Sequence, residues 1–145
     1  MADRTSSAVT IDASADAVLG VIADLHAYPE WNGEIKAVEV LDTFADGRAR
    51  QARFSISSSG MTDQYTLDYT WAPDGVSWTL VAPSQMQKKQ QGSYRLAEQD
   101  GRTEVTYDLA IESRIPMIGP MRRKIEKRIV DGALTQLQRR VETLR

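Results

Sequence analysis

Tyrosines and tryptophans that recur at alternate positions of strand-like runs are the residues of this chain best suited to chemistry. Each combines a large apolar area with one hydrogen-bonding atom, so several of them around one space suit a flat, partly oxygenated hydrophobic molecule. The candidates on the apolar face of the expected strands are Phe54, Tyr65, Tyr69, Trp78, Tyr94 and Tyr107. Any one of them could fill a core instead, but the set favours some lining of a pocket.

Lys88 would add a cation to this set if the alternation of its strand holds, because it then shares a face with Gln90 and Tyr94. An inward ammonium could hydrogen-bond a ligand carbonyl or carboxylate, or titrate low enough to act as a base. The alternative, which we favour, is a bulge or strand end near Gly92 that turns the lysine to solvent. Three more candidate ligand contacts lie at the start of the expected last helix: Met117, Met121 and Ile125.

The catalytic repertoire of the chain is narrow. It has no cysteine and a single histidine, His26, which excludes thiolate nucleophiles, Cys-containing zinc sites and multi-histidine metal centres. No paired carboxylates are expected on the inner face, and no Gly-rich phosphate loop is present. We therefore expect neither a metal nor a cofactor. Catalytic residues stay undefined, since any catalysis would depend on Tyr, Lys or Arg side chains in a cavity.

Hydrophobic periodicity predicts the strands that must position these side chains. Four dipeptides indicate the turns of an antiparallel meander: Asp46-Gly47, Ser59-Gly60, Asp74-Gly75 and Asp100-Gly101. The strands are expected near residues 7–11, 37–44, 48–56, 65–71, 76–80, 86–97 and 105–111. Their alternation of apolar and polar residues predicts a sheet with one apolar and one solvated face.

Two helices are predicted to bracket the middle strands. Ser14 can cap the first, in which Val18, Ile22 and Leu25 follow helical spacing. The second is expected from about residue 118 to 144, because apolar residues recur there every three or four positions. A helix of that length spans about 40 Å, so it must cross the whole domain along the apolar face of the sheet. Since a twisted sheet curves away from a straight rod, a cavity between them is a reasonable inference.

The order of these elements, with several local motifs, resembles the helix-grip fold of the START-like (SRPBCC) superfamily, in particular its polyketide cyclase/dehydrase-like branch. The motifs are Ile11–Val18, Ile22–Trp31 with its Tyr28-Pro29-x-Trp31 turn, Gly92–Leu96, and Ile115-Pro116. The resemblance covers essentially the whole chain. It implies an α+β fold: a curved antiparallel sheet of about seven strands wrapped around a long C-terminal helix, in one domain over residues 1–145. It also implies that Trp31 helps to close the cavity mouth. The family includes carriers, cyclases, ubiquinone-binding proteins and ribosome- or chaperone-associated members, so the chemistry stays open.

Charge is distributed unevenly, although the net value is only −2. Pro120–Arg145 holds eight basic and three acidic residues, and the rest of the chain holds ten basic and seventeen acidic ones. The basic helix is either a solvated face or a surface that attracts an acidic partner, a membrane or RNA. Without a nucleic-acid motif we expect no nucleic-acid binding. With 41% hydrophobic residues, no signal-like N-terminus and no apolar run of membrane length, we expect a cytoplasmic protein without integral membrane association.

Three functions follow, in order of preference. The first is binding of a hydrophobic small molecule, such as a polyketide, an isoprenoid or a lipid-like compound, in the cavity for transport or sequestration. The second is a polyketide cyclase or dehydratase that uses cavity Tyr and Lys residues. The third is an interaction module that docks through the basic C-terminal helix. The expected partner is therefore a hydrophobic ligand, and the expected state is a monomer or weak homodimer.

Overall fold

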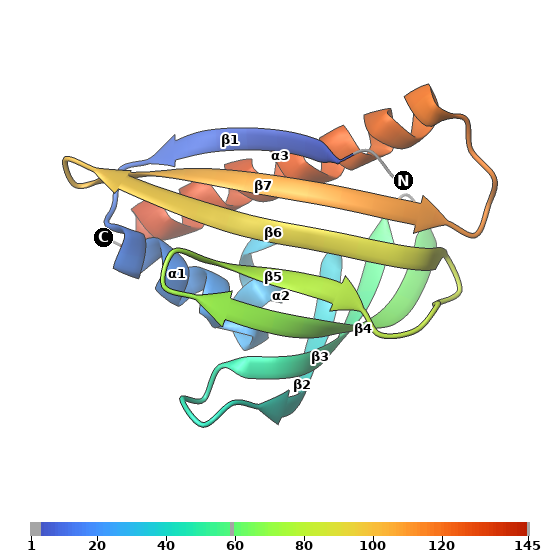
Figure 1. The fold of residues 1–145 in the computed structure, drawn as a ribbon, viewed down its shortest axis with the longest axis horizontal. Coiled ribbons are helices and arrows are strands. Elements are labelled where there is room, and N and C mark those ends of the chain that lie inside the picture. The colour runs from blue at the N-terminus through green and yellow to red at the C-terminus, as the bar shows by residue number, and fades with distance from the viewer. Residues whose placement is uncertain (1–3, 59, 145) are drawn as a thin grey trace.

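The computed structural model describes residues 4–58 and 60–144. Within them, one antiparallel sheet has the strand order β1-β7-β6-β5-β4-β3-β2. Its strands are β1 (Thr5–Ile11), β2 (Ile35–Thr43), β3 (Ala49–Ser58), β4 (Met61–Ala72), β5 (Gly75–Leu80), β6 (Gln87–Gln99) and β7 (Arg102–Ser113). The helical elements are α1 (Ala15–Ala23), the 3-10 turn η1 (Leu25–Ala27), α2 (Tyr28–Trp31) and α3 (Gly119–Thr143). This confirms the predicted helix-grip fold (Figure 1).

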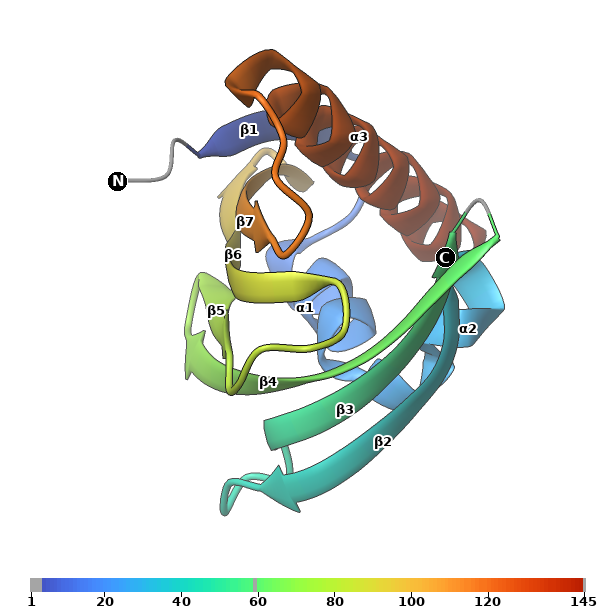
Figure 2. The same cartoon turned by 90° about the vertical axis from the view of Figure 1, so that its right-hand side faces the viewer.

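The sheet curls around α3, and its two edge strands, β1 and β2, are connected to the rest of the chain in different ways. Strands β2 to β7 follow one another as hairpins, whereas β1 pairs with β7 at the far edge. The segment α1-η1-α2 therefore crosses from one edge of the sheet to the other (Figure 2). Helix α3 packs chiefly on β1 and less on β7, so the rest of the concave face curves away from it.

The turns follow the predicted dipeptides with one correction. Asp100 and Gly101 both have positive φ, 56° and 78°, as a two-residue hairpin turn of the primed type requires. In the hairpin between β4 and β5, however, Ala72 pairs with Gly75, so the loop is Pro73-Asp74 and the glycine belongs to the strand. A Cβ at Gly75 would lie 2.1 Å from the Tyr94 carbonyl oxygen, which explains a glycine there. Ser59 of the second predicted turn lies outside the described residues.

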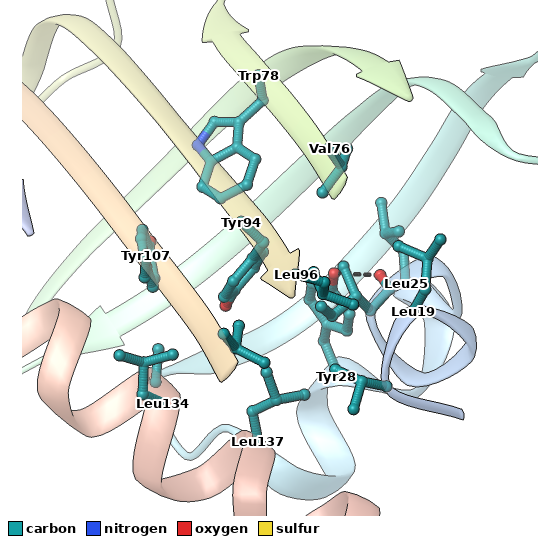
Figure 3. Packing of buried hydrophobic residues seen from close by; sticks show 14 of the residues in the cluster. Leu19, Leu25, Tyr28, Val76, Trp78, Tyr94, Leu96, Tyr107, Leu134 and Leu137 are labelled. Atoms are coloured by element: carbon teal, nitrogen blue, oxygen red, sulfur yellow. Dashed lines mark hydrogen bonds between the residues drawn. The ribbon is translucent and has the colours of Figure 1, made fainter. Parts of the chain in front are cut away.

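The helices begin and end close to the predicted residues. The Ser14 hydroxyl accepts a hydrogen bond from the Ala17 amide at 3.1 Å and caps α1. Helix α3 buries Val130, Leu134 and Leu137, and Figure 3 shows the last two facing the sheet. Among the described residues, no helix has both the length and the apolarity needed to cross a membrane.

Candidate ligand-binding site

A cavity of about 160 Å³ lies between α3 and the concave face of the sheet. Side chains from α2, from α3 and from β2 to β7 line it. Its aromatic lining is Tyr28, Trp31, Phe54, Tyr65, Tyr69, Trp78, Tyr94 and Tyr107. A larger depression of about 610 Å³ near Lys89 and Glu112 has a mostly exposed, more polar lining, so we take the inner cavity as the candidate site.

Seven of the eleven predicted ligand-contact residues line this cavity. They are Trp31, Phe54, Tyr65, Tyr69, Trp78, Tyr94 and Tyr107. The six on strands meet as cross-strand pairs, Phe54 with Tyr65, Tyr69 with Trp78, and Tyr94 with Tyr107. Ring centroids in these pairs are 5.7, 6.0 and 4.7 Å apart, within the range of favourable aromatic contacts. Strand alternation therefore brings the rings together, while their contact with a ligand stays a prediction.

The other four predicted contacts lie elsewhere. Lys88 is exposed, because a register shift between Gln87 and Lys89 turns both lysines outward and Gln87 inward. This corrects the inward interpretation of Lys88 and agrees with the favoured outward one, although the bulge lies at Gln87–Lys89 and Gly92 itself is regularly paired. The remaining three are Met117, which is partly buried, Met121 and Ile125, which are exposed, and none of them lines the cavity. The part of α3 that faces the cavity begins only at Arg128.

A chain of hydrogen bonds gives one wall of the cavity a polar character. The Trp78 Nε1 donates to Gln90 Oε1 at 3.0 Å, and Gln90 Nε2 donates to Gln87 Oε1 at 2.7 Å. Gln87 Nε2 in turn donates to Asp63 Oδ2 at 3.4 Å, and the Ser84 hydroxyl donates to the same oxygen at 2.7 Å. The Asp63 carboxylate thereby orients two glutamine amides, which form a hydrogen-bonded relay from this carboxylate to the indole ring of Trp78.

The sequence signals for this wall differ from residue to residue. Asp63 is buried and shares the alternation of Tyr65 and Leu67, so the period of β4 could have identified it as inward-facing. Gln87 carries no such signal, because its inward position depends on the bulge in β6. Gln90 lines the cavity, as its alternation with Tyr94 predicts.

Glycine determines how Trp78 lies in the cavity. Gly92 of β6 is paired directly with Trp78 of β5, and a Cβ on this glycine would lie 2.4 Å from the indole ring. The ring can therefore lie flat across the strand, from which its Nε1 reaches Gln90. Figure 3 shows Trp78, Tyr94 and Tyr107 extending from their strands toward α3, on which Leu134 lies.

Burial raises the pKa of all five tyrosines. They are Tyr28, Tyr65, Tyr69, Tyr94 and Tyr107. In each case desolvation is the largest cause, because a buried phenolate loses its hydration. The Asp63 carboxylate adds to the rise at Tyr65, and the Tyr28 hydroxyl donates to the Ile22 carbonyl. The cavity tyrosines are therefore neutral hydrogen-bonding groups and not general bases at neutral pH.

Two buried polar atoms of the lining have no hydrogen-bond partner among the described residues. They are Trp31 Nε1, on α2, and Gln136 Oε1, on α3. Leaving a buried polar group unpaired costs about 1–3 kcal/mol. The first atom is a donor and the second an acceptor, so a ligand that carries both an acceptor and a donor could satisfy them.

Two ion pairs connect the segment around α2 to α3 on the side of these atoms. Glu34 lies 3.9 Å from Arg128, and Glu30 lies 3.1 Å from Arg140. Glu34 and Arg128 both line the cavity. Ion pairs with such exposed carboxylates contribute about 0–1 kcal/mol. They can therefore separate at low cost, so we consider this side the mouth of the cavity.

Solved structures resemble the chain over nearly its whole length. A START superfamily protein from Mycobacterium smegmatis is 26% identical, with a TM-score of 0.91 over 98% of this chain and 99% of that one. The Zhui aromatase/cyclase from Streptomyces sp. R1128 is 17% identical, with a TM-score of 0.81 over 98% and 94%. A STAR-related lipid transfer protein from Xanthomonas axonopodis is 18% identical, with a TM-score of 0.74 over 94% and 84%. The last two show the fold alone. No curated protein matches the chain significantly.

The family model described as polyketide cyclase / dehydrase and lipid transport matches residues 2–142. The match spans every element that surrounds the cavity, from β1 to the last turn of α3. It agrees with the strand order and the long C-terminal helix, and with the Tyr28-Pro29-x-Trp31 turn beside the mouth. The chain therefore belongs to the polyketide cyclase/dehydrase and lipid transport family of the START-like superfamily.

Proposed function

We propose that the protein binds a compact hydrophobic molecule in the cavity between α3 and the sheet and carries or sequesters it. The observation behind this proposal is a buried cavity lined by aromatic rings, with a few neutral polar atoms directed into it. Such a combination holds an apolar ligand and fixes its orientation. Family membership supports the same function, since the family description includes lipid transport.

The size of the cavity narrows the class of ligand. Its volume of about 160 Å³ is close to that of a protein cavity that binds benzene, about 150 Å³, and below the ~300 Å³ where pockets for drug-sized ligands begin. We therefore propose a ligand of one or two rings, of polyketide or isoprenoid origin, in preference to a long-chain lipid. The unpaired atoms of Trp31 and Gln136 favour a ligand with a carbonyl and a hydroxyl group.

A cyclase or dehydratase is the second candidate. The observation that favours it is the hydrogen-bonded relay from Asp63 through Gln87 and Gln90, which could hold a substrate carbonyl beside Tyr65. We rank it below binding because the raised pKa of each cavity tyrosine keeps its phenol protonated, and because Lys88 faces solvent.

The test is a ligand titration that follows tryptophan fluorescence, to which Trp31 and Trp78 of the cavity contribute together with Trp71 outside it. The panel contains naphthols, hydroxylated acetophenones, cyclic terpenoid alcohols and, for comparison, long-chain fatty acids. We expect saturable quenching with the one- and two-ring compounds and none with the fatty acids. Saturable binding of the fatty acids alone would contradict the proposed size class, and failure of the whole panel, with no hydrophobic compound co-purifying under native conditions, would contradict the function itself.

A further inference from the structure

Exposed apolar side chains gather at the start of α3. Nine large hydrophobic residues are exposed in the part of the chain that the structure describes, and four of them lie between residues 115 and 125. These are Ile115, Ile118, Met121 and Ile125, with exposed fractions of 53%, 70%, 52% and 43%. The last three follow a spacing of three and four residues, which places them on one stripe of the helix. Ile129 continues the stripe and lines the cavity.

Basic residues flank this stripe. From Arg114 to Arg128 the chain holds six basic residues and one acidic residue, Glu126. Glu126 is buried, where it accepts hydrogen bonds from the Thr5 hydroxyl and the Ile111 amide, so it presents no charge to the surface. At 100° per residue, Arg122 falls on one side of the stripe and Lys124 on the other. The surface is therefore amphipathic, with cations along an apolar centre.

We propose that this surface docks on an anionic lipid bilayer. The docking face consists of the apolar residues Ile115, Ile118, Met121 and Ile125 and the basic residues Arg114, Arg122 and Lys124. Helices that lie in a membrane interface combine apolar side chains at the acyl boundary with Lys and Arg at the headgroups. Each basic residue near an anionic bilayer contributes about 1 kcal/mol.

Charge complementarity favours a membrane over a second copy of the chain. A two-fold dimer would bring the docking face against itself and oppose like charges. An anionic bilayer satisfies both parts of the face, because its headgroups pair with the cations and its acyl region receives the isoleucines and the methionine.

The position of the face connects docking to the cavity. Figure 1 shows the first turns of α3 at one end of the molecule, beside the connection from β7. Ile129 and Arg128, which follow the docking face along α3, both line the cavity. Docking would therefore bring the mouth close to the bilayer, so that a hydrophobic ligand could pass between them with little exposure to water. This last step rests on the proposed function, whereas docking itself does not.

Vesicle co-sedimentation tests the proposal with the full chain. We expect binding to vesicles of phosphatidylcholine mixed with phosphatidylglycerol, weak or no binding to phosphatidylcholine alone, and release by high salt. The double variant Ile118→Ser/Met121→Ser should weaken binding by about tenfold or more, because it removes two membrane contacts. Lys124→Glu should weaken it by more than about fivefold, because loss of one basic residue removes ~1 kcal/mol and the new carboxylate is repelled by the anionic headgroups in addition.

Matched controls make the same kinds of substitution at exposed positions outside the docking face. Leu41→Ser/Phe44→Ser removes two other exposed apolar side chains, and Lys88→Glu reverses an exposed lysine on β6, so each should alter binding by less than about twofold. Equal binding to both vesicle types, no binding to either, or equal effects of the docking-face and control variants would overturn the proposal. So would self-association that Ile118→Ser/Met121→Ser abolishes. Ligand titration of that variant without vesicles separates the two questions, since the cavity should bind as in the unmodified protein.

Discussion

The tyrosines show how a residue's environment decides its chemistry. A tyrosine has a hydroxyl that ionises at a pH of about 10 in water, and on a strand it could serve as an acid, a base or a hydrogen-bond donor. Here four are buried and Tyr65 is partly buried, and desolvation raises the pKa of every one. They remain protonated phenols across the physiological range, which suits orientation of a ligand better than proton abstraction.

A pH dependence of stability follows from these tyrosines. Below a pH of about 10 they are protonated in both the folded and the unfolded state, so they leave the free energy of unfolding unchanged. Above it the unfolded phenols lose protons that the folded ones keep, and the free energy of unfolding must fall as pH rises. Urea unfolding between neutral and strongly alkaline pH should show this fall. Tyr69→Phe should reduce the slope above the transition by about one proton of five.

The control is the near-ultraviolet absorbance of the phenolate. In the folded protein it should stay low while free tyrosine titrates, and it should rise only together with unfolding. Phenolate absorbance that develops at the ordinary tyrosine pKa, with the fold intact, would show that the hydroxyls are not sequestered.

At the scale of the element, α3 depends on a buried carboxylate for its position. Glu126 is 1% exposed, and its two oxygens accept from the Thr5 hydroxyl and the Ile111 amide, both at 2.7 Å. These bonds fasten the first half of α3 to β1 and β7. Periodicity alone predicts this helix as an apolar stripe, and it gives no reason to expect a glutamate inside. The burial of this glutamate is explained only by the packing of α3 against β1 and β7, which supply the Thr5 hydroxyl and the Ile111 amide.

Replacement of Glu126 should therefore lower the free energy of unfolding by more than replacement of a typical hydrophilic side chain does. Glu126→Ala leaves the partly buried Ile111 amide and the Thr5 hydroxyl without their partner, so we expect a loss of about 2–3 kcal/mol in the free energy of unfolding, measured with urea. Glu126→Gln keeps an acceptor and should lose roughly half as much. Glu142→Ala, on the same helix, removes an exposed contact with the Asp12 amide and should cost less than about 1 kcal/mol. Equal losses for the alanine variants at 126 and 142 would contradict this role.

Strand β6 shows how one irregularity redirects an element. Before the register shift Gln87 faces the cavity, and after it Gln90 does, so two lysines in succession are left outside. A strict alternation predicts Lys88 inside. The cavity consequently gains two neutral amides, bound to each other at 2.7 Å, where the unbroken pattern would have put a cation.

At the scale of the whole molecule, the cavity exists because α3 packs at one edge of a strongly curled sheet. Gly132 lines the cavity, and apart from its chain neighbours and the backbone of its own helix no atom lies within 4 Å of a Cβ placed on it. A side chain at this position would therefore start in open space and extend into the cavity.

A side chain that fills this space should weaken ligand binding without lowering the free energy of unfolding. Gly132→Leu should lower affinity for a one- or two-ring ligand by about tenfold or more, because the leucine occupies its volume. The free energy of unfolding should stay equal or rise by up to about 1 kcal/mol, since leucine is the better helix former. Gly20→Leu, at a similarly open position of α1 that is exposed and does not line the cavity, is the control and should bind as before. Fluorescence titration and urea unfolding measure the two quantities, and unchanged affinity of Gly132→Leu would place the ligand elsewhere.

By itself the sequence determined the strands, the long C-terminal helix and the inward set of aromatic side chains, and its resemblance to the START-like superfamily implied their helix-grip arrangement. The elements and the inward set follow from local periods: alternation places Tyr65, Tyr69 and Trp78 on one face, and the spacing of three and four residues predicts α3 to within one residue of each end. These patterns are properties of short segments, so the sequence carries them directly.

Only the tertiary structure decided which polar atoms share the cavity with these rings. The inward position of Gln87 depends on how β6 pairs with β7, and the unpartnered atoms of Trp31 and Gln136 come from helices far apart in the chain. The cavity volume likewise depends on the curl of the sheet and on the edge where α3 packs. Each is a relation between segments, which no local pattern can specify.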